Sequence, residues 1–425
     1  MRKFAFILSL FFTVCFCCGK TAEPVGVIRC QNPTIFLKKF STFLGKINPQ
    51  AANRKTESLS SFMYMHKLSA LNFQKPLTAY LFYIEQGIQT VFFGELQKGK
   101  LPEPFYIFPG QTLTPTVQKG IVKYVDAKFK QNVEALTPET VKLPQKLLAG
   151  RYFFRDQTKS KMEPVDPSSD LAAFLTAEFK SISFSLDFPK EDLLVFEMDL
   201  EAANKSNLTE FSNRHHPRFS EKPAVLPNPE FYIYTELPAS QTADYGVISF
   251  FSLIVPDFAN DEHIYGAFMH SIADNNHPTA LMLSKNQDYY LFSGILPSAE
   301  QKTLFEKFLK DHGNTYSGKS YMFHCENGTN VYAAISGNTA NLLIKRKNHT
   351  TQGIPQTFSS LKKLRPALAE REFLIGKTRI HDGSYQNMLS GTMSNGKFRL
   401  KADLNPYTVA VTLPRLLLGE ELFLE

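Results

Sequence analysis

Residues 76–96 read PLTAYLFYIEQGIQTVFFGEL, and this stretch decides the predicted fold. Two runs rich in β-branched and aromatic residues, 78–83 and 90–96, flank the polar turn Glu85-Gln86-Gly87. Such a pattern is typical of a β-hairpin. The first half of the chain is therefore expected to contain antiparallel sheet.

A similar order of features returns in the second half of the chain. Met-His pairs at 65–66 and 269–270 are 269 − 65 = 204 residues apart. Gly-Glu-Leu at 94–96 corresponds to Gly-Ile-Leu at 294–296, with an offset of 294 − 94 = 200. In both copies a proline and a Thr-Ala pair come between these features. We expect a tandem duplication of one unit; chance similarity of two hairpins is the alternative.

Helical signals flank these hairpins. Asn32-Pro33 opens an amphipathic stretch to residue 47, and Ser298 with Gln301 forms a capping box before residues 302–312. Further helices are expected at 60–71 and 116–130. The predicted fold class is α+β: two related units of antiparallel sheet flanked by amphipathic helices.

The expected division of the chain has four parts. Residues 1–19 form a signal peptide and residues 20–211 a first α+β domain. Residues 212–229, which hold four prolines, form a Pro-rich linker, and residues 230–425 a second α+β domain. A last strand pair is expected at 398–404 and 407–413, around Asn405-Pro406.

The N-terminus predicts export. Arg2 and Lys3 precede the apolar run 4–16, which is too short to span a bilayer and is typical of a signal-peptide core. Cleavage is expected just before Lys20. The protein would then reach the periplasm, the cell envelope or the exterior of a bacterial cell. No later stretch is long and apolar enough to cross a membrane, which leaves at most a lipid tether.

Cysteines raise two questions. Cys17 or Cys18 could be the lipidated residue of a bacterial lipoprotein, although the bulky Phe16 does not fit the required motif. Cys30 and Cys325 remain after the signal peptide is removed, and in an oxidising compartment they predict a disulfide. Two separate free thiols are the alternative.

The net charge of the chain and its histidines bear on two kinds of partner, nucleic acids and metal ions. The net charge of +7 falls to 7 − 2 = +5 without Arg2 and Lys3, so a nucleic-acid partner is not expected. His263 and His270 are the best metal candidates, but seven residues on a helix separate them by about 10.5 Å along its axis. No metal site and no cofactor are therefore predicted.

Motifs for chemistry are missing from the sequence. It contains no GxSxG, no phosphate-binding glycine loop and no HExxH. Glu197, Asp199 and Glu201 alternate along a predicted strand and are expected to form a solvated face. The sequence thus favours an exported, non-catalytic binding or envelope-associated protein with an unknown ligand. A hydrolase with dispersed catalytic residues and a carrier of an apolar ligand are the alternatives.

Overall fold

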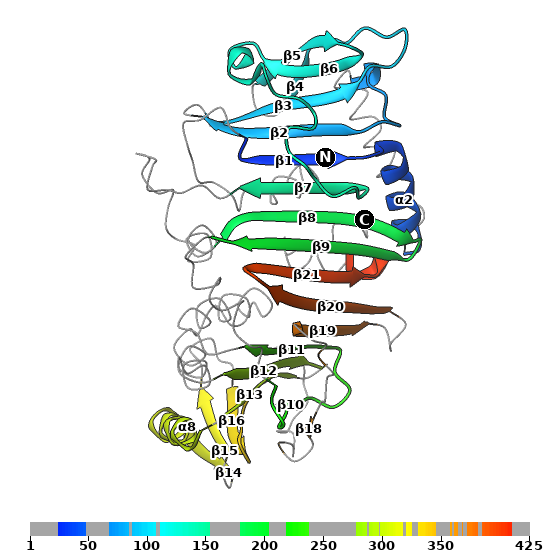
Figure 1. Ribbon diagram of the computed structural model, residues 1–425. Coiled ribbons are helices and arrows are strands. Elements are labelled where there is room, and N and C mark those ends of the chain that lie inside the picture. The colour runs from blue at the N-terminus through cyan, green and yellow to red at the C-terminus, as the bar shows by residue number, and fades with distance from the viewer. Residues whose placement is uncertain are drawn as a thin grey trace. The chain divides into compact units, whose positions relative to one another are not determined.

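The chain divides into two compact units (Figure 1). Unit 1 contains Met1–Glu201 and Asp403–Glu425, and unit 2 contains Ala202–Ala402, so unit 2 is inserted into unit 1. The computed structural model describes residues 24–47, 68–84, 87–107, 111–153, 179–203, 218–237, 278–286, 289–296, 298–317, 320–324, 330–345, 358, 361–363, 368, 372–380 and 385–409.

Unit 1 is built on one antiparallel sheet with the strand order β4-β5-β6-β3-β2-β1-β7-β8-β9. Both hairpin strands expected between residues 76 and 96 are present. The strands are β1 (Gly26–Cys30), β2 (Leu77–Ile84), β3 (Gly87–Glu95), β4 (Phe105–Ile107), β5 (Gln111–Gln118), β6 (Ile121–Asp126), β7 (Leu148–Phe153), β8 (Phe179–Lys190) and β9 (Leu193–Ala202).

Unit 2 is also built on an antiparallel sheet, with the order β14-β15-β16-β17-β13-β12-β11-β19-β20-β21. Two short strands, β10 (Ala224–Val225) and β18 (Lys362–Lys363), pair separately. The sheet strands are β11 (Phe231–Leu237), β12 (Thr279–Lys285), β13 (Tyr289–Ile295), β14 (Asn314–Ser317), β15 (Ser320–His324), β16 (Asn330–Ser336), β17 (Thr339–Lys345), β19 (Glu372–Ile380), β20 (Tyr385–Ser394) and β21 (Lys397–Leu404).

The two sheets have the same strand connectivity. In each, the first strand lies between the second strand and a strand that follows much later, which are β2 and β7 in unit 1 and β12 and β19 in unit 2. The third strand then pairs with a strand of the next hairpin, β6 or β17. The Leu96 amide donates to the Gly120 carbonyl at 2.8 Å, and the Leu296 amide donates to Asn338 at 2.7 Å. Leu96 and Leu296 therefore occupy equivalent places.

Within the described residues, the α-helices are α2 (Pro33–Gly45) and α8 (Ala299–His312). The Asn32 side chain accepts from the Ile35 amide at 2.9 Å, and Pro33 occupies the first turn, where its missing N–H costs nothing. Ser298 and Gln301 form the expected capping box of α8. Both helices are confirmed.

The α+β class is nevertheless wrong, because antiparallel sheet rather than helix dominates both units. The helix expected at 116–130 is absent: β5 and β6 form a hairpin through the turn Lys119-Gly120, and β6 pairs with β3. Of the helix expected at 60–71, the described residues hold only a short 3-10 turn at Leu68–Ala70. The strand expected at 407–413 is also wrong, since residues 406–409 form a helical turn.

Each sheet buries one face against its helix. In unit 1, the rings of Phe36, Phe40 and Phe43 on α2 pack against Phe188 of β8. In unit 2, α8 places Phe305 and Leu309 in the core formed by β12, β13, β15, β16 and β17. Period-two alternation turns the intervening residues to the opposite faces.

Connecting segments cover those opposite faces. In unit 1, Phe129 and Val133 pack on Tyr80 and Phe82. In unit 2, residues 224–226, from the predicted linker, are buried together with Tyr234 and Leu291. Among the described residues, each sheet thus has a helix on one face and a connecting segment on the other, which includes a 3-10 helix at Lys130–Val133 in unit 1 and β10 in unit 2.

A substitution at Gly150 of β7 tests the packing of unit 1. It lies beside Ile28 and Phe184, and an added Cβ would be 2.4 Å from two ring atoms of Phe184 and 3.0 Å from the Val27 carbonyl oxygen. We expect Gly150→Ala to lower the free energy of unfolding by about 1–3 kcal/mol, because the ring must move. Chemical denaturation measures this loss.

The matched control is Gly376 of β19, which occupies the equivalent position between Ile233 and Leu389. A Cβ there would meet no atom closer than 3.1 Å. Gly376→Ala is therefore expected to cost less than Gly150→Ala. Equal losses for the two variants would contradict the packing described for β7.

Candidate functional site

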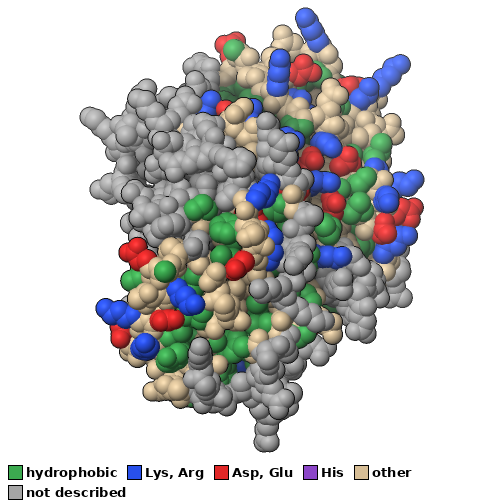
Figure 2. All heavy atoms as spheres, turned by 60° about the horizontal axis from the view of Figure 1, so that its bottom comes forward, with side chains coloured by type: hydrophobic (Ala, Val, Ile, Leu, Met, Phe, Trp, Pro, Cys, Tyr) green, Lys and Arg blue, Asp and Glu red, His purple; other side chains and the backbone are tan. Residues whose placement is uncertain are grey.

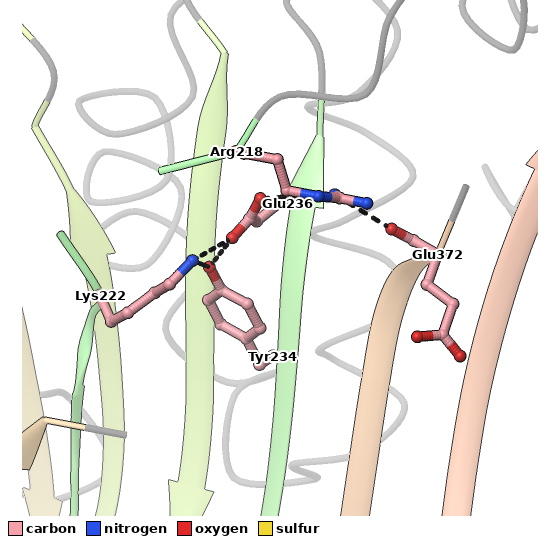
Figure 3. Close-up of polar contacts among 5 residues, drawn as sticks. All are labelled: Arg218, Lys222, Tyr234, Glu236 and Glu372. Carbon is pink, nitrogen blue, oxygen red and sulfur yellow. Dashed lines mark hydrogen bonds and ion pairs between the residues drawn. The ribbon is translucent and has the colours of Figure 1, made fainter. Parts of the chain in front are cut away.

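The most buried charge among the described residues belongs to unit 2. Glu236 of β11 is 0% exposed, and the Lys222 ammonium donates to its Oε1 at 2.6 Å (Figure 3). The Tyr234 hydroxyl donates to the same oxygen. Tyr234 and Glu236 are two apart on one strand, so both side chains point to the same face. A carboxylate, an ammonium and a phenol therefore meet at one point.

Arg218 completes this cluster from the solvent side. Its Nη1 lies 3.7 Å from Glu236 Oε2 and donates to the backbone carbonyl of Glu372 at 3.4 Å. Within the described part of the chain, Oε2 itself accepts no hydrogen bond. The ion pair with Arg218 is thus the contact that compensates this oxygen.

The environment keeps Tyr234 neutral. Burial raises the pKa of the Tyr234 phenol far above its usual range, and the hydrogen bond to Glu236 and the charge of that carboxylate raise it further. The Arg218 charge acts in the opposite direction without overcoming them. The phenol is consequently a hydrogen-bond donor here, and it is a poor nucleophile or base.

The cluster is part of a longer set of hydrogen bonds that hold residues 222–226 against the sheet. The amides of Ala224 and Leu226 donate to Ser293 Oγ at 2.8 Å and to Ser284 Oγ at 3.1 Å. Ser293 in turn donates to Asn341 Oδ1 at 2.9 Å. These serines and Asn341 are buried in the sheet, so they satisfy backbone groups that would otherwise lack partners. Residues 222–226 are fixed across β12 and β13.

A second polar group lies on β7, β8 and β9 of unit 1. Arg151 Nη2 donates to Glu201 Oε2 at 2.7 Å, and Ser181 Oγ donates to the same oxygen at 3.1 Å. Ser185 donates to Glu197 at 3.3 Å. Glu197 and Glu201 thus share one face, as their spacing indicates, but they are half-buried and paired rather than simply solvated.

The charge of Glu201 is stabilised by its partners. Burial alone would raise the pKa of this carboxyl, but the Ser181 hydrogen bond and the charges of Lys180 and Arg151 outweigh it and hold the pKa below its usual value. The stabilisation is therefore present above the ordinary glutamate pKa of about 4.3 and is lost as the pH falls below it.

Cys30 corrects the disulfide prediction. It is a free thiol at the end of β1, so the expected Cys30–Cys325 bridge is wrong. Burial raises the pKa of the Cys30 thiol to about 11, although a hydrogen bond with the Asn32 backbone opposes the rise. A thiol that stays protonated at neutral pH is a weak nucleophile. Cys325 lies outside the described residues.

The other predicted site residues also fall outside the described ranges: Cys17, Cys18, His263 and His270. Over the ranges that are described, no three His, Cys, Asp or Glu side chains come together as a metal site. In the same ranges, no helix combines the length and the apolar character needed to cross a bilayer.

Comparison with known proteins adds no assignment. No family model matches the chain, and no curated protein matches it.

The sequence alone does not predict the cluster around Glu236. Its partners Lys222 and Arg218 precede β11 in a stretch with little apolar patterning. One signal was present: Glu236 shares a strand face with Tyr234 in a run, 231–237, that is otherwise rich in apolar residues. A charge in such a place needs a buried partner.

Proposed function

We propose that this chain is an exported, non-catalytic binding or envelope-associated protein of bacterial type. The observation that carries the proposal is that the buried and half-buried ionisable groups in the described part of the chain are paired or held neutral. Glu236 is paired with Lys222, and Glu201 with Arg151. The Tyr234 phenol and the Cys30 thiol are held neutral.

Catalysis needs groups whose pKa values are matched to proton transfer near the working pH. The pKa values of Tyr234 and Cys30 are instead raised, away from neutral pH. The carboxylates of Glu236 and Glu201 form ion pairs that hold chain segments together. These features support a scaffold that presents surfaces. The N-terminal sequence supports export, because Arg2 and Lys3 precede the apolar run 4–16.

The test is expression of the full chain in a bacterium, followed by fractionation and intact-mass measurement. We expect the protein in the envelope or medium with a mature N-terminus at Lys20. An acyl-sized excess on Cys17 or Cys18 would instead indicate a tethered lipoprotein. Full-length protein that stays in the cytoplasm would overturn the proposal.

The matched control breaks the apolar run. A Leu8→Arg, Leu10→Arg variant is expected to remain uncleaved in the cytoplasm, because a signal-peptide core must be apolar. Native mass measurement of the exported protein addresses the binding half of the proposal. Extra mass that disappears on denaturation would identify a bound ligand, and turnover of a hydrolase substrate panel would contradict a non-catalytic role.

A further inference from the structure

One end of the unit 1 sheet exposes apolar side chains among lysines. Leu101 is 87% exposed and Val117 is 49% exposed. Lys98, Lys100 and Lys119 are also exposed, and none is paired with a described acidic residue. We call these five residues the lysine end. Figure 2 shows Lys and Arg side chains that project from the surface of the molecule, with Asp and Glu side chains among them.

The backbone brings these residues together. The loop after β3 and the β5–β6 turn are joined by the hydrogen bond from the Leu96 amide to the Gly120 carbonyl, 2.8 Å. The loop itself is fixed, because the Gln97 amide donates to Ala70 at 2.8 Å and the Lys100 amide donates to Gln97 at 3.1 Å. Leu101 is thus presented on an ordered loop.

Lys119 occupies an unfavourable backbone conformation. Its φ is 50°, in the left-handed region that favours glycine. The corresponding β16–β17 turn of unit 2 has Gly337 there, with φ of 64°. Unit 1 therefore holds a charged side chain at the tip of a turn where glycine would fit without strain.

Unit 2 differs at the same end of its sheet. After Leu296, the equivalent of Leu96, the chain forms the helix α8, where unit 1 has a loop. Leu304 on α8 is 54% exposed, but Lys302, Lys307 and Lys310 alternate there with Glu300, Glu306 and Asp311. The loop of unit 1 carries Glu103 as its acidic residue, so positive charge prevails at the lysine end.

We propose that the lysine end docks on the surface of an anionic lipid bilayer. This proposal rests on the proposed envelope function, and it names the partner of the protein in that function. An exposed leucine can enter the headgroup boundary, and lysines beside it are attracted to anionic lipids. The three ammonium groups and Leu101 share one loop cluster, so one orientation satisfies both interactions.

The experiment uses the mature chain, residues 20–425, and two kinds of vesicle, phosphatidylcholine alone and phosphatidylcholine with phosphatidylglycerol. We expect sedimentation with the anionic vesicles only, weakening as salt is raised. Lys98→Gln, Lys100→Gln, Lys119→Gln together should reduce the affinity on the order of 100-fold, from the usual attraction of each lysine to an anionic surface. Leu101→Ser should reduce it roughly tenfold, from the apolar area it would leave in water.

Two controls separate docking from general charge and from misfolding. Lys302→Gln, Lys307→Gln, Lys310→Gln with Leu304→Ser on α8 should leave the affinity unchanged. Lys119→Gly should weaken binding while keeping or raising the thermal midpoint, because it relieves the backbone conformation. Equal binding to both vesicles, equal losses in the two lysine triples, or no effect of Leu101→Ser would overturn the proposal. Export and vesicle binding are measured separately, so either can fail alone.

Discussion

Replacing Glu236 by alanine is expected to lower the free energy of unfolding of unit 2 by about 3–5 kcal/mol. The side chain is fully buried, and its loss leaves the Lys222 ammonium without its partner at 2.6 Å and the Tyr234 hydroxyl without an acceptor. Removing one member of a buried ion pair has costs of about this size, because the remaining charge is uncompensated. Hydrogen exchange of the β11 and β12 amides would localise the loss to unit 2.

The control for this variant removes the charges together. Lys222→Met, Tyr234→Phe, Glu236→Leu replaces the three polar groups by apolar ones of similar size and should recover most of the lost stability. Arg218 is partly exposed and can turn its charge to water. A surface ion pair contributes up to about 1 kcal/mol. If Glu236→Ala alone lowered the free energy of unfolding by less than this, the cluster would not stabilise unit 2 in the way described here.

Phe305→Ala is expected to have an effect of similar size, about 3–5 kcal/mol, since truncating a buried Phe leaves a cavity. Phe305 is 0% exposed and lies with Leu309, Phe323 and Val331 in the core beneath α8. Its neighbour Phe308 stacks on Phe323, so the helix has little freedom to collapse into the space. Denaturant titration with exchange of the β16 and β17 amides would measure the loss.

The adjacent residue supplies the comparison. Leu304 is exposed on the other side of α8, and Leu304→Ala should change stability by no more than about 0.5 kcal/mol. Equal effects of the two substitutions would mean that α8 does not cover the sheet through Phe305.

Local sequence signals predict the starts of α2 and α8 and the hairpin of β2 and β3 correctly, but the Asn-Pro signal is ambiguous. Asn32-Pro33 was correctly interpreted as a helix start. Asn405-Pro406 carries the same chemistry, with the Asn405 side chain accepting from the Thr408 amide at 2.9 Å, although its place between two β-rich runs predicts a hairpin turn. The strand before it pairs instead with β20, through the turn Asn395-Gly396.

Long-range pairing explains why residues 116–130 do not form the expected helix. Val117, Ile121, Val122 and Val125 match a helical spacing, although Gly120 inside the stretch disfavours a helix. The structure places Tyr124 opposite Phe92, a partner 124 − 92 = 32 residues away, and the β-branched residues then fit a pleated sheet. The charged cluster at Glu236 was not predicted for the same reason, because its burial depends on a segment crossing another part of the sheet.

The division of the chain has a consequence for synthesis on the ribosome. Leu404, Tyr407 and Val409 contribute to the core of unit 1 beside Phe43 and Phe188. These three residues emerge only after all of Ala202–Ala402 has been translated. Unit 1 is therefore the first unit whose synthesis begins and the last to be completed. A chain that stops at residue 402 would contain all of unit 2, but α2 would lack part of its packing.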